Sequence, residues 1–227
     1  MEEKTEPTDI FLWANQTDGI KNELDVEFFL FNKNYTPYST NFNSDLNVQI
    51  KPLFLYDMIN FVNLGAGTGL SVSDYELSEN EDSVLLRTEL EKVGRAQTLI
   101  HQIENERGDI VQFAEEEHEF KRIKGIVARF THRNNPKKAF YAIKAIQQGN
   151  VLKGATSWEF RDGKFGAFQA DVGLKISPDN QVLIVDGDIF AFNPSKFEKL
   201  FNYDYKKQLL ADKKVEEIEK HFKLSFP

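Results

Sequence analysis

The chain has 227 residues, of which 41% are hydrophobic and 13% aromatic, and its formal net charge is −8. This much apolar material can offset chain entropy by burial, which excludes global disorder, and the absence of cysteine excludes disulfides and thiolate metal or redox sites. No apolar run approaches the roughly 18 to 20 residues that span a bilayer, and the acidic residues 1–9 do not resemble a signal or transit peptide, so we expect a cytoplasmic protein.

The first part of the chain predicts two strands and a short helix. Residues 24–30 alternate apolar and polar side chains, as half-buried strands do, and a turn leads to a second strand over 35–40. Apolar residues at helical spacing predict a helix over 54–62. The glycine-rich loop 65–69 that follows matches no nucleotide-binding fingerprint, so we interpret it as a flexible connection.

A long amphipathic helix is predicted over residues 83–106. Apolar side chains recur there on one face from Leu86 to Ile103, and Gly108 is expected to end the helix. A short strand over 109–113 and an acidic connector should follow.

From Lys121 onward the apolar periodicity changes to two, which is typical of strands. Turn-forming sequences, including Asp186-Gly187, separate the segments and predict tight hairpins. The predicted strands cover residues 121–133, 137–148, 156–160, 165–169, 172–176, 181–185 and 189–192. A capping box over 195–198 then predicts a helix, and a charged helical tail should bury Val215 and Ile218.

These elements predict an α+β fold. We expect an antiparallel, curled meander sheet over about 120–193, with helices packed on one of its faces. The change of periodicity places a boundary near residue 119. It divides the chain into a mixed α/β part over 1–118, ending in the long helix, and a sheet with C-terminal helices over 119–227, with one continuous domain as the alternative.

Charge is distributed unevenly along the chain. Between Asp74 and Glu119, 14 acidic residues face 4 basic ones, a net charge of −10. The basic block, residues 121–164, holds 11 cations against Glu159 and Asp162, a net charge of +9. Such a block creates a local positive field on a protein that is negative overall.

The basic block predicts a nucleic-acid interface. Cations contact phosphates, and interleaved aromatics such as Phe140, Tyr141 and Trp158 could stack on unpaired bases. We therefore predict backbone-directed binding of DNA or another polyanion, without base specificity. The predicted nucleic-acid-binding residues are Arg122, Lys124, Arg129, Arg133, Lys137, Lys138, Lys144, Lys153, Arg161 and Lys164. Strand alternation should place Arg129 and Arg133 on one face, and Arg122 and Lys124 on the other.

An alternative hypothesis is an interaction scaffold. In that case the cations form the solvated side of the sheet, or pair with the acidic segment 74–119 of the same chain or of a second subunit. This arrangement favours a homo-oligomer.

A further alternative is a Mg²⁺-dependent nuclease. Asp109, Glu119 and Lys121 have the residue types of such a site, but a Glu-x-Lys match arises easily by chance beside the acidic run 115–117. The four histidines show no metal-ligand spacing. We accordingly predict no catalytic residues, no metal and no cofactor, and we favour a binding protein over an enzyme.

The order of segments resembles a known family. A long amphipathic segment precedes a strand-rich stretch that closes with the sequence VDGDIFAFNPSKFEKLF over residues 185–201. Over about residues 80–225 this pattern is similar to component B of the Kiwa anti-phage defence system (the KwaB-like family). The resemblance implies a bacterial defence protein that binds DNA beside a small membrane protein (KwaA-like), which would recruit it to the inner face of the membrane. The motif contains no catalytic signature, so no site residue is transferred from the family.

Overall fold

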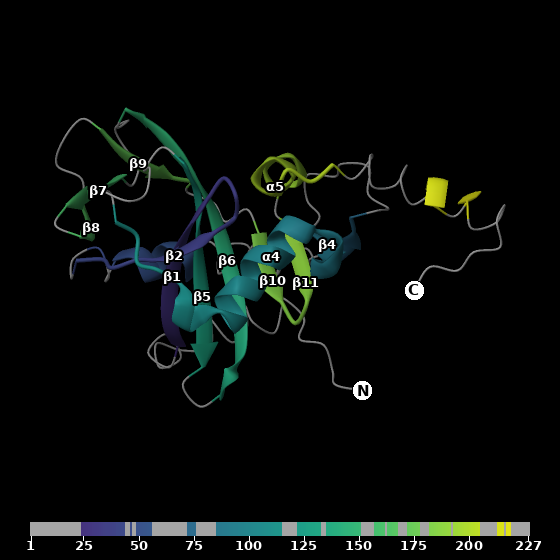
Figure 1. The fold of residues 1–227 in the computed structure, drawn as a ribbon, viewed down its shortest axis with the longest axis horizontal. Helices are drawn as coiled ribbons and strands as arrows, with labels where there is room; N and C mark the ends of the chain where they lie inside the picture. Colours follow the sequence, from purple (N-terminus) through teal and green to yellow (C-terminus); the bar gives the residue numbers. More distant parts are fainter. Residues whose placement is uncertain are drawn as a thin grey trace, which may run out of the picture.

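The computed structural model describes the central part of the chain and two short C-terminal stretches, drawn in colour in Figure 1. The described residues are 24–43, 46, 49–55, 72–75, 85–114, 122–132, 135–150, 157–161, 163–167, 172–177, 182–191, 193–204, 213–215 and 217–218. The glycine-rich loop 65–69 lies outside them.

The described strands form one open, largely antiparallel sheet with few helices, which confirms the α+β class (Figure 1). The strands are β1 Leu24–Asn32, β2 Pro37–Ser39, β3 Val72–Asp74, β4 Leu85–Glu89, β5 Ile123–His132, β6 Asn135–Asn150, β7 Ser157–Arg161, β8 Lys164–Ala167, β9 Val172–Ile176, β10 Val182–Val185 and β11 Asp188–Ala191. The helices are η1 Leu90–Lys92, α4 Gly94–Asn105, η2 Arg107–Asp109 and α5 Pro194–Phe201, and residues 49–55 are also helical.

The strand order interleaves the two halves of the chain. The main path runs β2-β1-β5-β6-β10-β11-β4-β3, while β7, β8 and β9 branch from the far end of β6. The N-terminal strand β1 pairs with β5 along its whole length, and β4 pairs with β11. Hydrogen bonds therefore connect strands from both sides of residue 119, and the meander predicted over 120–193 is the centre of a larger sheet.

Each face of the sheet carries its own hydrophobic core. Val127 and Ile143 point to the face covered by α4 and α5, where they pack with Leu99 and Phe197. Neighbouring strand residues point to the opposite face, as strand alternation requires. The core on that face includes Ile126, Ala128, Phe130 and Phe140, together with Ile50 and Phe54 from the helical residues 49–55. Helical segments thus cover both faces, whereas the sequence predicted only one.

The prediction of a helix over residues 83–106 is wrong for the first part of this range, which forms strand β4. Leu85 and Leu86 are both buried but belong to opposite cores, which only an extended backbone allows. Pairing with β11 on one side and β3 on the other fixes β4 as a strand. The helix begins at Gly94 instead, with its buried residues at helical spacing up to Ile103.

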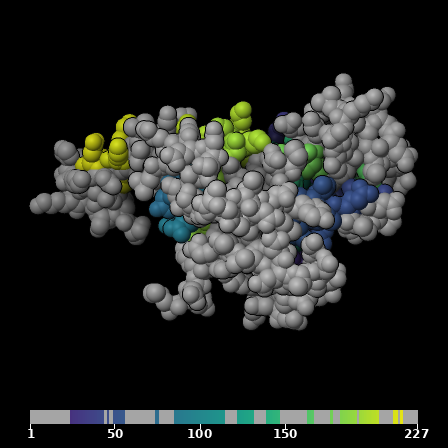
Figure 2. All heavy atoms as spheres, turned by 180° about the vertical axis from the view of Figure 1, so that it is seen from behind, coloured from purple at the N-terminus to yellow at the C-terminus, as the bar shows by residue number. Residues whose placement is uncertain are grey.

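Two local predictions near the C-terminus need correction, and one is confirmed. Asp186 and Gly187 have φ angles of 47° and 82°, as the predicted tight hairpin requires. Helix α5 is capped by Asn193, whose side chain accepts from the Lys196 amide, rather than by the predicted capping box. Val215 and Ile218, predicted to be buried, are each 46% exposed. They belong to the yellow segment at one end of the molecule (Figure 2).

Candidate functional site

A β-bulge in β5 determines which way Lys124 points. Phe31 of β1 pairs with Gly125, but the next residue, Asn32, pairs with Ile123, so Lys124 is the extra residue between them. In a regular strand Lys124 would share the face of Ile126. The bulge instead turns it to the face of α4 and α5, where it contacts Tyr35. The predicted separation of Lys124 from the Arg129 face is therefore wrong.

Tyr35 forms the centre of this site in the turn between β1 and β2. Its φ of 65° lies in the left-handed region, which costs a bulky residue about 1–2 kcal/mol. Several contacts hold it there: its ring stacks on Phe31 and on Phe201, and its hydroxyl donates to the carbonyl oxygen of Leu200 at 3.0 Å. Only 3% of Tyr35 is exposed, so its hydroxyl is a fixed point.

Two cations converge on this hydroxyl from different elements. Lys124 Nζ lies 2.6 Å from the Tyr35 oxygen, and a guanidinium nitrogen of Arg95, in the first turn of α4, lies 3.5 Å from it. Both charged groups also approach the Tyr35 ring, at 4.8 and 5.3 Å from its centroid. In the part of the chain that the structure describes, neither cation pairs with a carboxylate.

Two further basic residues border this point. The amide of Lys33 donates to the carbonyl oxygen of Arg122 at 3.0 Å, which brings the β1–β2 turn against the start of β5. Both residues are exposed. We name Tyr35, Arg95 and Lys124, with the neighbouring Lys33 and Arg122, the Tyr35 cluster. Its chemistry suits an anion, because two adjacent positive charges repel each other until a negative group lies between them.

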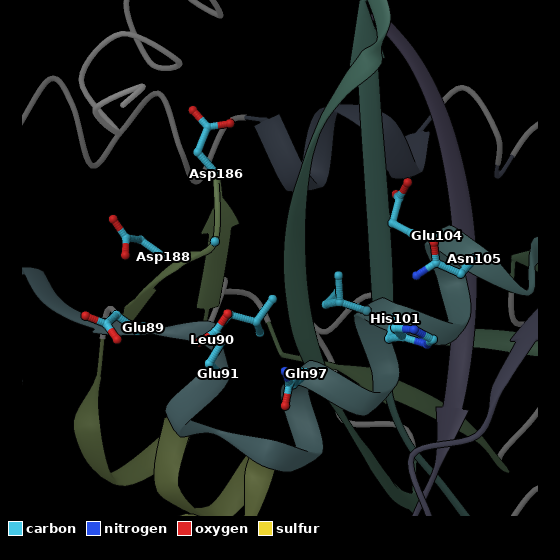
Figure 3. A pocket seen from close by; sticks show the side chains of 11 residues that line it. Glu89, Leu90, Glu91, Gln97, His101, Glu104, Asn105, Asp186 and Asp188 are labelled. Carbon is cyan, nitrogen blue, oxygen red and sulfur yellow. The ribbon is translucent and has the colours of Figure 1, made fainter. Parts of the chain in front are cut away.

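The other flank of α4 lines a pocket of opposite charge, about 450 Å³ in volume (Figure 3). Residues 97, 101 and 104, spaced by about one helical turn, line it from α4, while the β10–β11 hairpin and the end of β4 supply the opposite wall. Its carboxylates are Glu89, Glu91, Glu104, Asp186 and Asp188. Like-charge repulsion excludes phosphate from this pocket, so the two flanks of α4 differ in the ligands they can take.

Glu104 connects the acidic pocket to the interior of the sheet. Arg129, whose side chain is only 6% exposed, contacts Glu104 at 2.7 and 3.4 Å and Glu27 at 3.2 Å. The Tyr141 hydroxyl donates to the same Glu104 carboxylate, and Arg107 pairs with Glu27 at 3.1 Å. The network thus ties α4 to β1, β5 and β6.

The network shifts the pKa values of its members. Burial alone would raise the pKa of Glu104, but hydrogen bonds from Arg129 and Tyr141, with the charges of Arg129 and Arg107, outweigh it and hold this pKa below its ordinary value. Burial and the adjacent carboxylate raise the pKa of Tyr141. At neutral pH the Glu104 carboxylate and the Arg129 guanidinium are therefore charged, while the Tyr141 hydroxyl is neutral.

The lowered pKa of Glu104 predicts an acid-labile contribution to stability. A depressed folded-state pKa stabilises the protein above the unfolded value, ordinarily 4.5, and this stabilisation is lost as the pH falls through the folded pKa. The Glu104→Gln variant lacks this titration. We expect the difference in unfolding free energy between the two proteins to shrink from about pH 6 to about pH 3 in urea titrations. A constant difference would contradict the assignment.

The structure places the predicted nucleic-acid-binding residues in three groups. Arg122, Lys124 and Lys164 are exposed or half-exposed. Arg129 and Lys144 lie inside the protein rather than on an open surface, because the Glu104 network surrounds Arg129 and the helical residues 49–55 cover Lys144, which is 1% exposed with its ammonium 5.3 Å from the Phe54 ring centroid. The side chains of Lys137, Lys138 and Arg161, and all of Arg133 and Lys153, lie outside the described residues.

Sequence reasoning did not find Lys33, Tyr35 and Arg95. They lie outside the basic block, and Arg95 sits in the acidic segment 74–119. Only the fold brings them to Lys124. No local signal in the sequence marks them.

The nuclease hypothesis gains no geometry from the structure. Asp109 is exposed in η2, while Glu119 and Lys121 lie outside the described residues. Among the residues that are described, no group of three histidines or carboxylates is placed to hold a metal ion.

Comparison with known proteins gives no assignment: no family model, no curated protein and no solved structure matches this chain. Within the described part, no helix has the length and apolarity to cross a bilayer.

Proposed function

We propose that this protein binds the phosphate backbone of DNA without sequence specificity, with the Tyr35 cluster as its principal contact. The observation that carries the proposal is the convergence of Lys124 and Arg95 on one buried hydroxyl, without a carboxylate partner among the described residues. A phosphate oxygen between them would replace cation–cation repulsion with charge-assisted hydrogen bonds.

The net charge of the whole protein affects the strength and the salt dependence of DNA binding. The chain carries a net charge of −8, so its long-range interaction with DNA is repulsive and local contacts must supply the affinity. Each phosphate contact by Lys or Arg releases counterions, so affinity should fall steeply as salt rises. Arg122 and Lys33, at the border of the cluster, can contact phosphates next to the first.

The similarity of residues 80–225 to component B of the Kiwa system supports DNA as the polyanion. It also adds a biological setting to the proposal, which is anti-phage defence in the cytoplasm beside a small membrane protein. The geometry of the Tyr35 cluster supports the phosphate contact and is independent of that setting.

Replacing both Arg95 and Lys124 by Ala should weaken DNA binding at least about tenfold and reduce the slope of log affinity against log salt by about 2. Fluorescence anisotropy with a labelled oligonucleotide at several salt concentrations measures both quantities.

The matched control replaces Lys213 and Lys214 by Ala. Both are exposed in the C-terminal helical stretch, so this variant loses the same two charges away from the cluster. Its affinity should stay within about twofold of the unmodified protein. Equal weakening in both variants would mean that net charge, rather than the cluster, determines affinity. The absence of binding by the unmodified protein at low salt would remove the proposed function altogether.

A further inference from the structure

Two cations of the Tyr35 cluster, Lys124 and Arg95, form a point contact at its centre rather than a groove. Lys124 and Arg95 both lie within 3.5 Å of one oxygen atom, so their donors can meet on a single phosphate group. Lysine has three N–H donors and arginine has five, and the Tyr35 oxygen occupies only one of each. Most of the donors at this point can therefore contact a ligand.

Among the side chains that the structure describes, no cationic track continues from this point along β5. Arg129 is the next cation of β5 on this face, and it is buried in the Glu104 network, while Lys144 of β6 lies on the opposite face beneath the helical residues 49–55. Proteins that bind single-stranded nucleic acid along its backbone use a positively charged groove that contacts successive phosphates. The described geometry instead concentrates charge at one position.

A terminal phosphate matches this position better than an internal one. A phosphate monoester carries about −1.5 to −2 charges at neutral pH and presents three acceptor oxygens. An internal phosphodiester carries a single negative charge and two non-bridging oxygens. Because Lys124 and Arg95 approach one point from two elements, the additional charge and the third oxygen both gain partners.

We infer that the Tyr35 cluster is a phosphate-monoester site, which holds the terminal phosphate of a nucleic-acid end or of a nucleotide in preference to an internal phosphodiester. The inference rests on the proposed function and narrows its ligand. Tyr35 acts as a positioning residue, because its buried hydroxyl holds Lys124 and Arg95 at the same point.

The experiment compares oligonucleotides of one sequence that end in a 5′-phosphate or a 5′-hydroxyl. A 5′-hydroxyl oligonucleotide that is two nucleotides longer adds two phosphodiester charges and so controls for total charge without a monoester. We expect the 5′-phosphate oligonucleotide to bind about tenfold more tightly than either control by anisotropy. In the double variant with Arg95→Ala and Lys124→Ala, this preference should disappear.

Tyr35→Phe separates positioning from folding. The variant keeps the stacked ring and removes the hydroxyl, so the fold should persist while the preference for the 5′-phosphate drops severalfold. Its circular dichroism spectrum and urea midpoint report folding. A preference that is unchanged in a folded Tyr35→Phe protein would overturn the positioning role.

A competition experiment with a nucleoside monophosphate shows whether the phosphate monoester belongs to a nucleotide or to a nucleic-acid end. Displacement of the 5′-phosphate oligonucleotide by the mononucleotide at similar concentration supports a nucleotide ligand, and displacement only by a phosphorylated oligonucleotide supports a nucleic-acid end. Equal affinity for all three oligonucleotides would overturn the monoester inference and leave backbone binding in place. If none of them binds, both proposals fail.

Discussion

Replacing Arg129 by Met should lower the free energy of unfolding by about 1.5–3 kcal/mol, because it removes the buried partner of two half-exposed carboxylates. Arg129 is 5% exposed and holds the carboxylates of both Glu104 and Glu27. Without it, the Glu104 carboxylate and the Tyr141 hydroxyl lose their hydrogen-bonded cation, and Glu27 keeps only its ion pair with Arg107. Methionine fills a similar volume, so the loss reports the charge rather than a cavity. Urea denaturation followed by circular dichroism measures it.

Two further variants test the cause of this effect. Lys164→Met removes an exposed cation from the same sequence block and should change stability by less than about 0.5 kcal/mol. Adding Glu104→Gln to Arg129→Met removes one of the stranded charges and should restore part of the lost stability. A loss below about 1 kcal/mol in Arg129→Met would show that solvent, and not Glu104 and Glu27, satisfies this guanidinium.

Gly125→Val should destabilise the protein by about 3 kcal/mol or more, because a side chain at this position overpacks a filled core. A Cβ atom here would collide with the Phe31 ring and lie 2.9 Å from the backbone oxygen of Lys144. The ring cannot move away, since Phe31 is fully buried and stacked on Tyr35. Thermal unfolding measures the loss. The variant should also weaken DNA binding, because the displaced ring supports Tyr35.

Gly94→Ala is the matched control for this substitution. Nothing lies within 4 Å of a Cβ atom at Gly94, which opens α4, and its φ is not positive. Alanine favours the helix, so the midpoint should stay the same or rise slightly. If Gly125→Val were as stable as Gly94→Ala, the close packing of Phe31 against β5 would be wrong.

The sequence predicts the sheet well where periodicity and turns agree. From Lys121 to residue 192 alternation and hairpin sequences identified each described strand, and β9 has the predicted bounds. The sequence-based prediction failed at β4. Leu86, Leu90 and Val93 are also spaced like the apolar face of a helix, and only the pairing with β11 shows that the segment is a strand. Local pattern cannot reveal a tertiary partner.

The candidate site was less predictable, for two physical reasons. The direction in which Lys124 points was not predictable, because it depends on a bulge that appears only when β1 pairs with β5. Arg129 was predicted on an open surface, because its burial depends on Glu104 and Glu27, which approach from two distant elements. Tyr35 and Arg95 are 60 residues apart in sequence, so no spacing rule connects them.

The pairing of β1 with β5 has a consequence for how the chain acquires its fold. Leu24 is paired with His132, about a hundred residues later, whereas only two residues separate the end of β5 from the start of β6. Closing a short loop has a smaller entropic cost, so the β5–β6 hairpin should form first and serve as the template on which β1 later docks. During synthesis β1 must therefore wait, with its apolar side chains unpaired, until β5 has been synthesised. Refolding from denaturant should accordingly be slower than for a helical protein of the same length.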